Sequence, residues 1–218
     1  MPAVDAGLPR LVRSVFQHQP AVSHVFLGSR RHVMEQLFSD PLRPLYRSAR
    51  TLPLGPIGSE PFAAFIRDRF QATGKRASEG AIARLLVVTG GHPQGTQQLC
   101  SQLWQATAAG AEAGDAEFER ALERAVAAED AYFTAVWDGL SKKQRLLLRA
   151  IAQEGFGVYA QAYRQRHQLG SQASVQTALR RLLERELVEG SAERGYRLAD
   201  TLFAAWLAGG ARPDVGGR

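Results

Sequence analysis

The sequence has a single cysteine and no long apolar run among its 218 residues. Cys100 can form no internal disulfide, which is typical of a reducing compartment, and we interpret it as a small buried hydrophobic residue. No apolar stretch approaches the roughly 20 residues that a membrane-spanning helix needs. The N-terminal MPAVDAGLPR lacks the basic cluster and apolar stretch of a signal peptide. We therefore expect a cytoplasmic protein with no membrane partner.

Motifs of nucleotide and metal chemistry are also missing. No G-x-x-x-x-G-K-[ST] occurs, although the amides, Lys and Ser/Thr of this phosphate-binding loop hold a nucleotide and its Mg²⁺. The sole Gly-Lys pair, Gly74-Lys75, is followed by Arg76 and lies at an expected helix end. No strand ends in an acidic pair, the histidines show no metal-ligand spacing, and no G-x-S-x-G nucleophile elbow occurs. We expect no catalytic residue, no metal site and no nucleotide hydrolysis by this chain alone.

The net charge of +6 is unevenly distributed along the chain. Residues 1–58 carry +4 (7 − 3), residues 59–130 carry −3 (7 − 10), residues 131–208 carry +4 (11 − 7), and the tail carries +1 (2 − 1). A basic balance of this size permits a polyanionic partner but does not require one, because arginine-rich compositions give the same charge without a nucleic-acid role.

Residues 1–58 predict a short amphipathic helix followed by strands. Leu8 to Phe16 has the apolar spacing of one helical face. The compact apolar run His24–Leu27 closes at Gly28 and predicts a buried strand, and Arg50–Leu54 is a candidate second strand. Because two strands have too few neighbours for a sheet, this segment resembles the trailing edge of something larger and is expected to be poorly ordered alone.

Residues 59–139 predict a small bundle of helices. Ser59 and Ser78 are expected to cap helices, and Gly74 lies where a left-handed C-terminal residue is needed. The expected helices run from Ser59 towards Gly74, from Ser78 to the stop at Gly90–Pro93, from about Gln94 to Ala109, from Asp115 to about Ala128, and from Tyr132 towards Leu140.

Residues 140–208 predict a winged helix, followed by a flexible tail at 209–218. Ser141 and Gln144 have the spacing of a capping box, so a helix begins there and continues to Gly155. The later elements are a helix from about Tyr159 to His167, a turn at Leu169–Ser171, a helix from Ser171 to Arg185, and strands at Leu187–Glu189 and Tyr196–Leu198 around a polar loop. The fold class is thus mainly α.

The helix from Ser171 to Arg185 occupies the place of a recognition helix, which enters the major groove of DNA. Outward polar and basic residues suit phosphates and base edges, and the candidate DNA-binding residues are Gln172, Gln176, Thr177, Arg180, Arg181, Arg185 and, on the wing, Arg194. Glu184, Glu186 and Glu189 flank this cluster and would repel phosphates. A solvated basic face, or a surface for a protein partner, remains the alternative.

Three segments together resemble the AAA+/STAND P-loop ATPases called archaeal-type ATPases. They are His24–Met34, similar to the sensor 1 strand; Gly90–Pro93, similar to the GxP motif of the lid; and the winged helix. The resemblance implies that Ser29 and Arg30 sense the γ-phosphate and that Gly91, His92 and Pro93 lie near the adenine. It also implies a remnant of an α/β P-loop core at 1–58 and a helical lid at 59–139.

The chain departs from this family by lacking the Walker A and Walker B motifs, which lie upstream of sensor 1 in the family. We therefore expect ATP or ADP to bind only when a P-loop domain is supplied in cis or in trans. The sequence would then be a fragment, the product of a misplaced start codon, or half of a split gene. The competing hypothesis is a stand-alone winged-helix module that binds double-stranded DNA or a protein.

Overall fold

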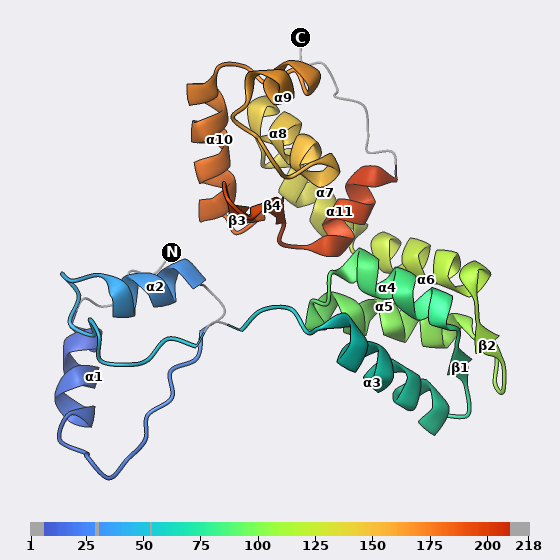
Figure 1. Cartoon of the computed structure of the whole chain (residues 1–218), viewed down its shortest axis with the longest axis horizontal. Coiled ribbons are helices and arrows are strands. Elements are labelled where there is room, and N and C mark those ends of the chain that lie inside the picture. The colour runs from blue at the N-terminus through green and yellow to red at the C-terminus, as the bar shows by residue number, and fades with distance from the viewer. Residues whose placement is uncertain (1–6, 29–30, 53, 210–218) are drawn as a thin grey trace. The chain divides into compact units, whose positions relative to one another are not determined.

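The structure is a computed structural model that describes residues 7–28, 31–52 and 54–209 (Figure 1). The chain divides into two compact units, Met1–Gly55 (unit 1) and Pro56–Arg218 (unit 2). Within the described residues, no helix has both the length and the apolar composition that a membrane span requires.

Unit 1 contains two helices, α1 (Leu8–Phe16) and α2 (Arg31–Ser39). The amphipathic helix expected at Leu8–Phe16 is confirmed, but none of its residues is buried. The sequence reasoning missed α2, because its residues were assigned to the end of the sensor 1 segment. Its Leu37 and the buried Phe38 lie one helical turn after Val33 and Met34, and this spacing could have revealed the helix.

The strand predicted at His24–Leu27 is wrong. The backbone is extended there, but it pairs with no described strand, and the described residues of Arg50–Leu54 form no strand either. Only Phe26 of the run faces inward, with its ring centroid 5.6 Å from that of Phe16 and 5.1 Å from that of Phe38. The apolar pattern correctly marks an extended segment, but a β-strand also needs a neighbour to accept its backbone hydrogen bonds.

The first half of unit 2 is the expected helical bundle. Its helices are α3 (Ser59–Ala72), α4 (Glu79–Thr89), α5 (Pro93–Ala106), α6 (Asp115–Ala128) and α7 (Asp130–Asp138). Ser78 caps α4 as predicted, because its Oγ accepts a hydrogen bond from the amide of Ala81 at 3.1 Å. At α3 the prediction is wrong by one residue, since Gly58 is the N-cap and Ser59 is the first helical residue.

A short parallel strand pair ties the loops of this bundle together. β1 (Arg76–Ala77) pairs with β2 (Glu112–Ala113), so that the loop after α3 is joined to the loop after α5. Ala77 and Ala113 are buried. Two-residue strands far apart in the sequence give no periodic signal, so sequence reasoning did not find them.

The second half of unit 2 is a winged helix. Its elements are α8 (Lys142–Gln153), α9 (Gln161–Arg166), α10 (Gln172–Glu184), β3 (Val188–Ser191), β4 (Gly195–Leu198) and α11 (Thr201–Ala208). The capping box is confirmed: the amide of Ser141 donates to Gln144 Oε1 at 2.8 Å, and the amide of Gln144 donates to Ser141 Oγ at 3.4 Å. The two strands are antiparallel, with Val188 opposite Leu198.

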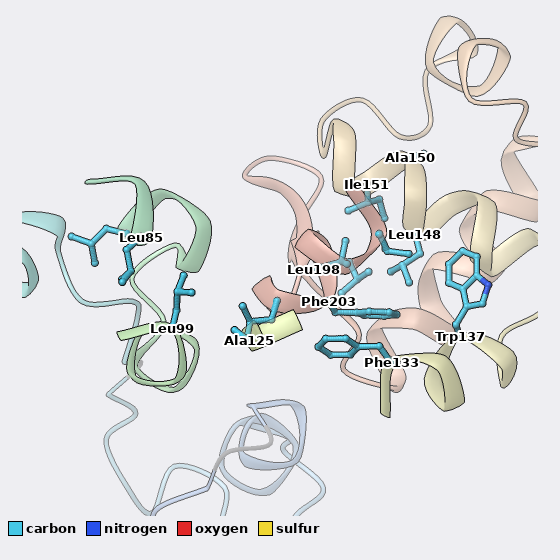
Figure 2. Close-up of a cluster of buried hydrophobic side chains, with 14 of the residues drawn as sticks. Leu85, Leu99, Ala125, Phe133, Trp137, Leu148, Ala150, Ile151, Leu198 and Phe203 are labelled. Atoms are coloured by element: carbon cyan, nitrogen blue, oxygen red, sulfur yellow. The ribbon is translucent and has the colours of Figure 1, made fainter. Parts of the chain in front are cut away.

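The bundle and the winged helix share one hydrophobic core (Figure 2). α11 follows the wing in sequence but packs against α4, α6 and α7 of the bundle. Phe133 of α7 stacks on Phe203 of α11, with ring centroids 5.1 Å apart (Figure 2). The indole of Trp206 also donates to Asp130 Oδ1 at 2.8 Å. Phe133 and Phe203 are buried and each contribute about 1.5–3 kcal/mol, so the bundle and the winged helix stabilise one another.

Candidate functional site

The GxP-like segment forms the turn between α4 and α5. Gly90 and Gly91 both have left-handed backbones, with φ of 57° and 72°, and His92 is the N-cap of α5. Pro93 is the first residue of that helix, where its missing amide and fixed φ are favourable. The glycines therefore end one helix, and the proline begins the next.

Gly91 is also in contact with the segment that leads into α3. The amide of Ile57 donates to the carbonyl of Gly91 at 3.0 Å. A Cβ at Gly91 would overlap the carbonyl oxygen of Ile57. Glycine is required at this position both by the left-handed φ and by the close approach of another backbone.

His92 faces the wing. Its Nε2 lies 3.4 Å from Glu189 Oε1, and the same oxygen accepts a hydrogen bond from Arg197 Nε at 2.7 Å. The geometry leaves His92 Nε2 without a hydrogen-bond partner although the atom is buried. This ring nitrogen therefore faces the Glu189 carboxylate and is shielded from solvent.

A buried pair of threonines below the turn was not anticipated from the sequence. Thr89 and Thr96 are 0% and 1% exposed, and their Oγ1 atoms lie 2.8 Å apart. The hydrogen bond between them ties the last turn of α4 to the first turn of α5. The only sequence signal for this pair is that one threonine precedes the two glycines and the other follows them by a few residues.

Gly91, His92 and Pro93 thus lie together at a helix junction, beside residues of the linker and the wing. Ser29 and Arg30, the expected phosphate-sensing residues, lie outside the described residues. No group of His, Cys, Asp and Glu side chains in the described part of the chain could hold a metal ion. The nucleotide-related predictions stay predictions.

Five of the candidate DNA-binding residues lie on one exposed face of α10. The polar and basic side chains on the outer face of α10 are Gln172, Gln176, Thr177, Arg180 and Arg181. Arg194 is exposed in the turn between β3 and β4. The buried face of the same helix carries Val175, Ala178, Leu179 and Leu182, which separates the polar face from the core.

Two features limit how freely the arginines of this face can contact phosphates. Glu184 pairs with Arg181 at 2.9 Å and approaches Arg180 at 3.9 Å, so one carboxylate is shared by both guanidinium groups. Arg185 donates from Nη1 to the carbonyl of Gly139 at 2.8 Å, at the C-terminal end of α7. The sequence predicted Arg185 on the recognition surface, and in the structure this exposed residue is hydrogen-bonded to the end of α7 in the helical bundle.

Shifted side-chain pKa values in unit 2 do not point to acid–base chemistry near neutral pH. Burial raises the pKa of Cys100, Tyr163 and Tyr196 to about 12 in each case. A hydrogen bond from the backbone of Gly114 is the main cause that lowers the pKa of Glu117. Catalytic acids and bases instead have pKa values moved towards the working pH.

Comparison with known proteins agrees with the winged helix. Residues 131–209 match the model of a family described as a probable winged helix domain. This match includes α7 as well as the elements from α8 to α11. No curated protein sequence matches the chain.

The fold of the chain is similar to that of a Walker-type ATPase of Pyrococcus abyssi, with a TM-score of 0.68 and 16% sequence identity. The similarity covers 95% of this chain but 59% of that chain, so this chain spans less than two thirds of that ATPase. It extends beyond the winged helix to most of the chain and shows a fold shared with part of that ATPase.

Proposed function

We propose that the chain is the lid and winged-helix portion of an AAA+/STAND-type ATPase, completed by a P-loop domain in the same or another polypeptide. In this proposal the chain contributes a nucleotide-dependent regulatory arm and does not hydrolyse ATP alone. The observation that carries the proposal is the fold similarity over 95% of the chain to a Walker-type ATPase that is longer than the matched region.

The surface of unit 1 supports a partner that supplies a sheet. Val25 and Leu27 are 80% and 88% exposed in an extended segment, and the described residues form no backbone hydrogen bond with residues 23–28. An apolar groove of about 260 Å³ lies beside this segment, lined by Leu11, Val12, Val15, Phe16, His24 and Phe26. Unpaired extended backbone beside apolar surface is suited to pairing with another strand.

The α4–α5 turn is compatible with a role in binding adenine. The partly exposed ring of His92 and the exposed Pro93 offer surface against which a purine could pack. We also propose that Ser29 and Arg30 sense the γ-phosphate, because a cation stabilises its charge and responds to its loss. Because the lid and winged helix form one body, a change at the nucleotide would move the winged helix.

The first test is to translate the DNA immediately upstream of Met1. An in-frame G-x-x-x-x-G-K-[ST] within about 150 codons, roughly one domain, supports the proposal. The longer protein should bind ATP in calorimetry and hydrolyse it, whereas the 218-residue chain should do neither. Tight ATP binding by the 218-residue chain would contradict our proposal, as would the absence of a P-loop domain both upstream and among the proteins that co-purify with the chain.

DNA binding by the winged helix is a second candidate, favoured by the exposed polar face of α10 and the exposed Arg194. Replacing Arg180 and Arg181 by Ala should weaken binding to a DNA duplex and lower the slope of log K against log salt by up to about 2. The matched control replaces Arg120 and Arg124 of α6, which removes the same charge elsewhere. Duplex binding that is equal in the two double variants would exclude α10 as a recognition helix and favour a protein partner.

A further inference from the structure

Three segments that are distant in the sequence meet at the α4–α5 turn. The linker at residues 56–58, which follows unit 1 in the chain, contacts Gly91. β3 of the wing contacts His92 through Glu189. The beginning of α11 contacts the first turn of α5, where a Cβ at Gly95 would lie 3.0 Å from Thr201 Oγ1. A single turn thus has the linker, the wing and the last helix as neighbours.

The contact with the linker is made by backbone atoms. The Ile57 amide donates to Gly91, and the Ile57 carbonyl lies where a side chain at Gly91 would be. The atoms of Ile57 that approach Gly91 most closely are its backbone O and C, and its side chain is 42% exposed. A displacement of the linker would therefore move the backbone of Gly91, the residue that precedes His92.

The contact with the wing is made by charged groups. Glu189 lies between His92 on one side and Arg197 of β4 on the other, with distances of 3.4 Å and 2.7 Å. Glu189 and Arg197 are also directly opposite each other in the β3–β4 register. Movement of the His92 ring therefore changes the surroundings of the one carboxylate that joins the two wing strands.

The turn itself is stiff. Its two helices are joined below the glycines by the buried hydrogen bond between Thr89 and Thr96. Displacement at Gly91 is consequently expected to reorient His92 rather than to be absorbed by separation of α4 and α5. Packed elements of this kind transmit small shifts because they have few intermediate arrangements.

We infer that the α4–α5 turn mechanically couples the linker at residues 56–58 to the wing, with Gly91 as the contact for the linker and His92 as the contact for the wing. The coupling goes beyond the proposed ATPase role, since it needs no nucleotide and would operate for any partner that displaces the linker. The regulated element is the β3–β4 wing, whose order depends on where the linker lies.

Hydrogen exchange measured by mass spectrometry on the full chain tests this coupling. Gly91→Ala should displace the linker and raise the exchange rate of wing amides at 188–198 by about fivefold or more. The matched control is Gly74→Ala, because Gly74 has nearly the same φ, 71°, but nothing within 4 Å of its Cβ position. Both variants carry the left-handed strain, and only Gly91→Ala also clashes with the linker.

A second pair of variants removes the contact without adding a side chain at the turn. Ile57→Pro deletes the amide that donates to Gly91. Leu54→Pro is the control, because Leu54 is exposed and lies just before the linker. Ile57→Pro should raise wing exchange, and Leu54→Pro should not. In a His92→Ala background, Ile57→Pro should no longer change the wing, because the contact with Glu189 is already lost.

The result that overturns the inference is a change confined to residues 56–58 and 89–93, with wing exchange equal to that of the Gly74→Ala and Leu54→Pro controls. An unchanged effect of Ile57→Pro in the His92→Ala background would exclude His92 as the connecting residue. If Gly91→Ala does not fold by circular dichroism, the comparison of Ile57→Pro with Leu54→Pro decides the question alone.

Discussion

Unit 1 and unit 2 differ in how much of their apolar surface they bury. In unit 2 a continuous core runs from Phe62 of α3 to Leu207 of α11, and it contains large side chains such as Leu85, Phe118 and Phe133 at 0–1% exposure. In unit 1 the buried hydrophobic residues of the described segments are Phe38 and Leu45. Meanwhile Leu42 and Leu54 are 91% and 86% exposed.

The difference indicates which part of the chain carries its own stability. Folding must offset about 1–2 kcal/mol of backbone entropy per residue, and buried apolar area is the main compensation. Unit 2 has that compensation and unit 1 has little of it. An apolar surface as exposed as that of unit 1 is typical of a region that packs against something else, which agrees with the proposed P-loop partner.

The largest expected effect lies in the shared core of unit 2. Phe133→Ala should lower the free energy of unfolding by about 3–5 kcal/mol, because it deletes a fully buried ring that stacks on Phe203. The control is Tyr132→Ala, next in sequence and 57% exposed, which should cost about 1 kcal/mol or less. Chemical denaturation should show one transition in both, and two separate transitions would show that the helical bundle and the winged helix fold independently.

Alkaline pH should destabilise unit 2 by an intermediate amount. Burial raises the pKa of the Cys100 thiol from 9.0 to about 12, so the native state keeps a proton that the unfolded chain releases. The protonated thiol's contribution to the free energy of unfolding is complete below pH 9. This contribution is lost progressively as the pH rises from 9 to 12. In Cys100→Ala, the decrease in the free energy of unfolding between pH 8 and pH 10.5 should be smaller by on the order of 2 kcal/mol. Denaturation curves at pH 8 and pH 10.5 give the comparison, and an equal decline in both proteins would show that the thiol is not shielded.

The smallest effect is expected in unit 1. Leu27→Ser should change the free energy of unfolding by less than about 0.5 kcal/mol, since the side chain is already 88% exposed. Leu85→Ser, at 0% exposure in unit 2, should cost more than about 3 kcal/mol. Leu27→Ser should nevertheless weaken assembly with a P-loop domain. Comparable losses of stability in the two serine variants would refute the contrast between the units.

Features predicted well from the sequence are those that local chemistry determines. The capping box at Ser141 and Gln144, the cap at Ser78 and the left-handed Gly74 each depend on residues within a few positions. The apolar spacing of α8 and α10, with the two short strands after them, was enough to indicate the winged helix. Local signals of this kind need no knowledge of the rest of the chain.

Features missed or mistaken depend on distant partners. The run at His24–Leu27 has the composition of a buried strand, but composition cannot supply the neighbouring strand that would bury it. Arg185 was predicted on the DNA-facing surface from its position on the helix, and that position could not reveal its hydrogen bond to Gly139, 46 residues away. The contact with Ile57 explains why glycine is needed at position 91. The residues next to Gly91 in the sequence give no sign of this contact.

Hydrogen exchange on the unmodified chain tests most directly the claim that the helical bundle and winged helix are stable by themselves, whereas the extended segment at residues 23–28 is not. The account predicts that amides at residues 23–28 exchange within about tenfold of the rates of an unfolded peptide, whereas the central amides of α4, α5 and α11 are slowed together by a factor of about 10⁴ or more. Strong protection at residues 23–28 in the isolated chain, or protection of α4 and α5 that differs greatly from that of α11, would contradict it.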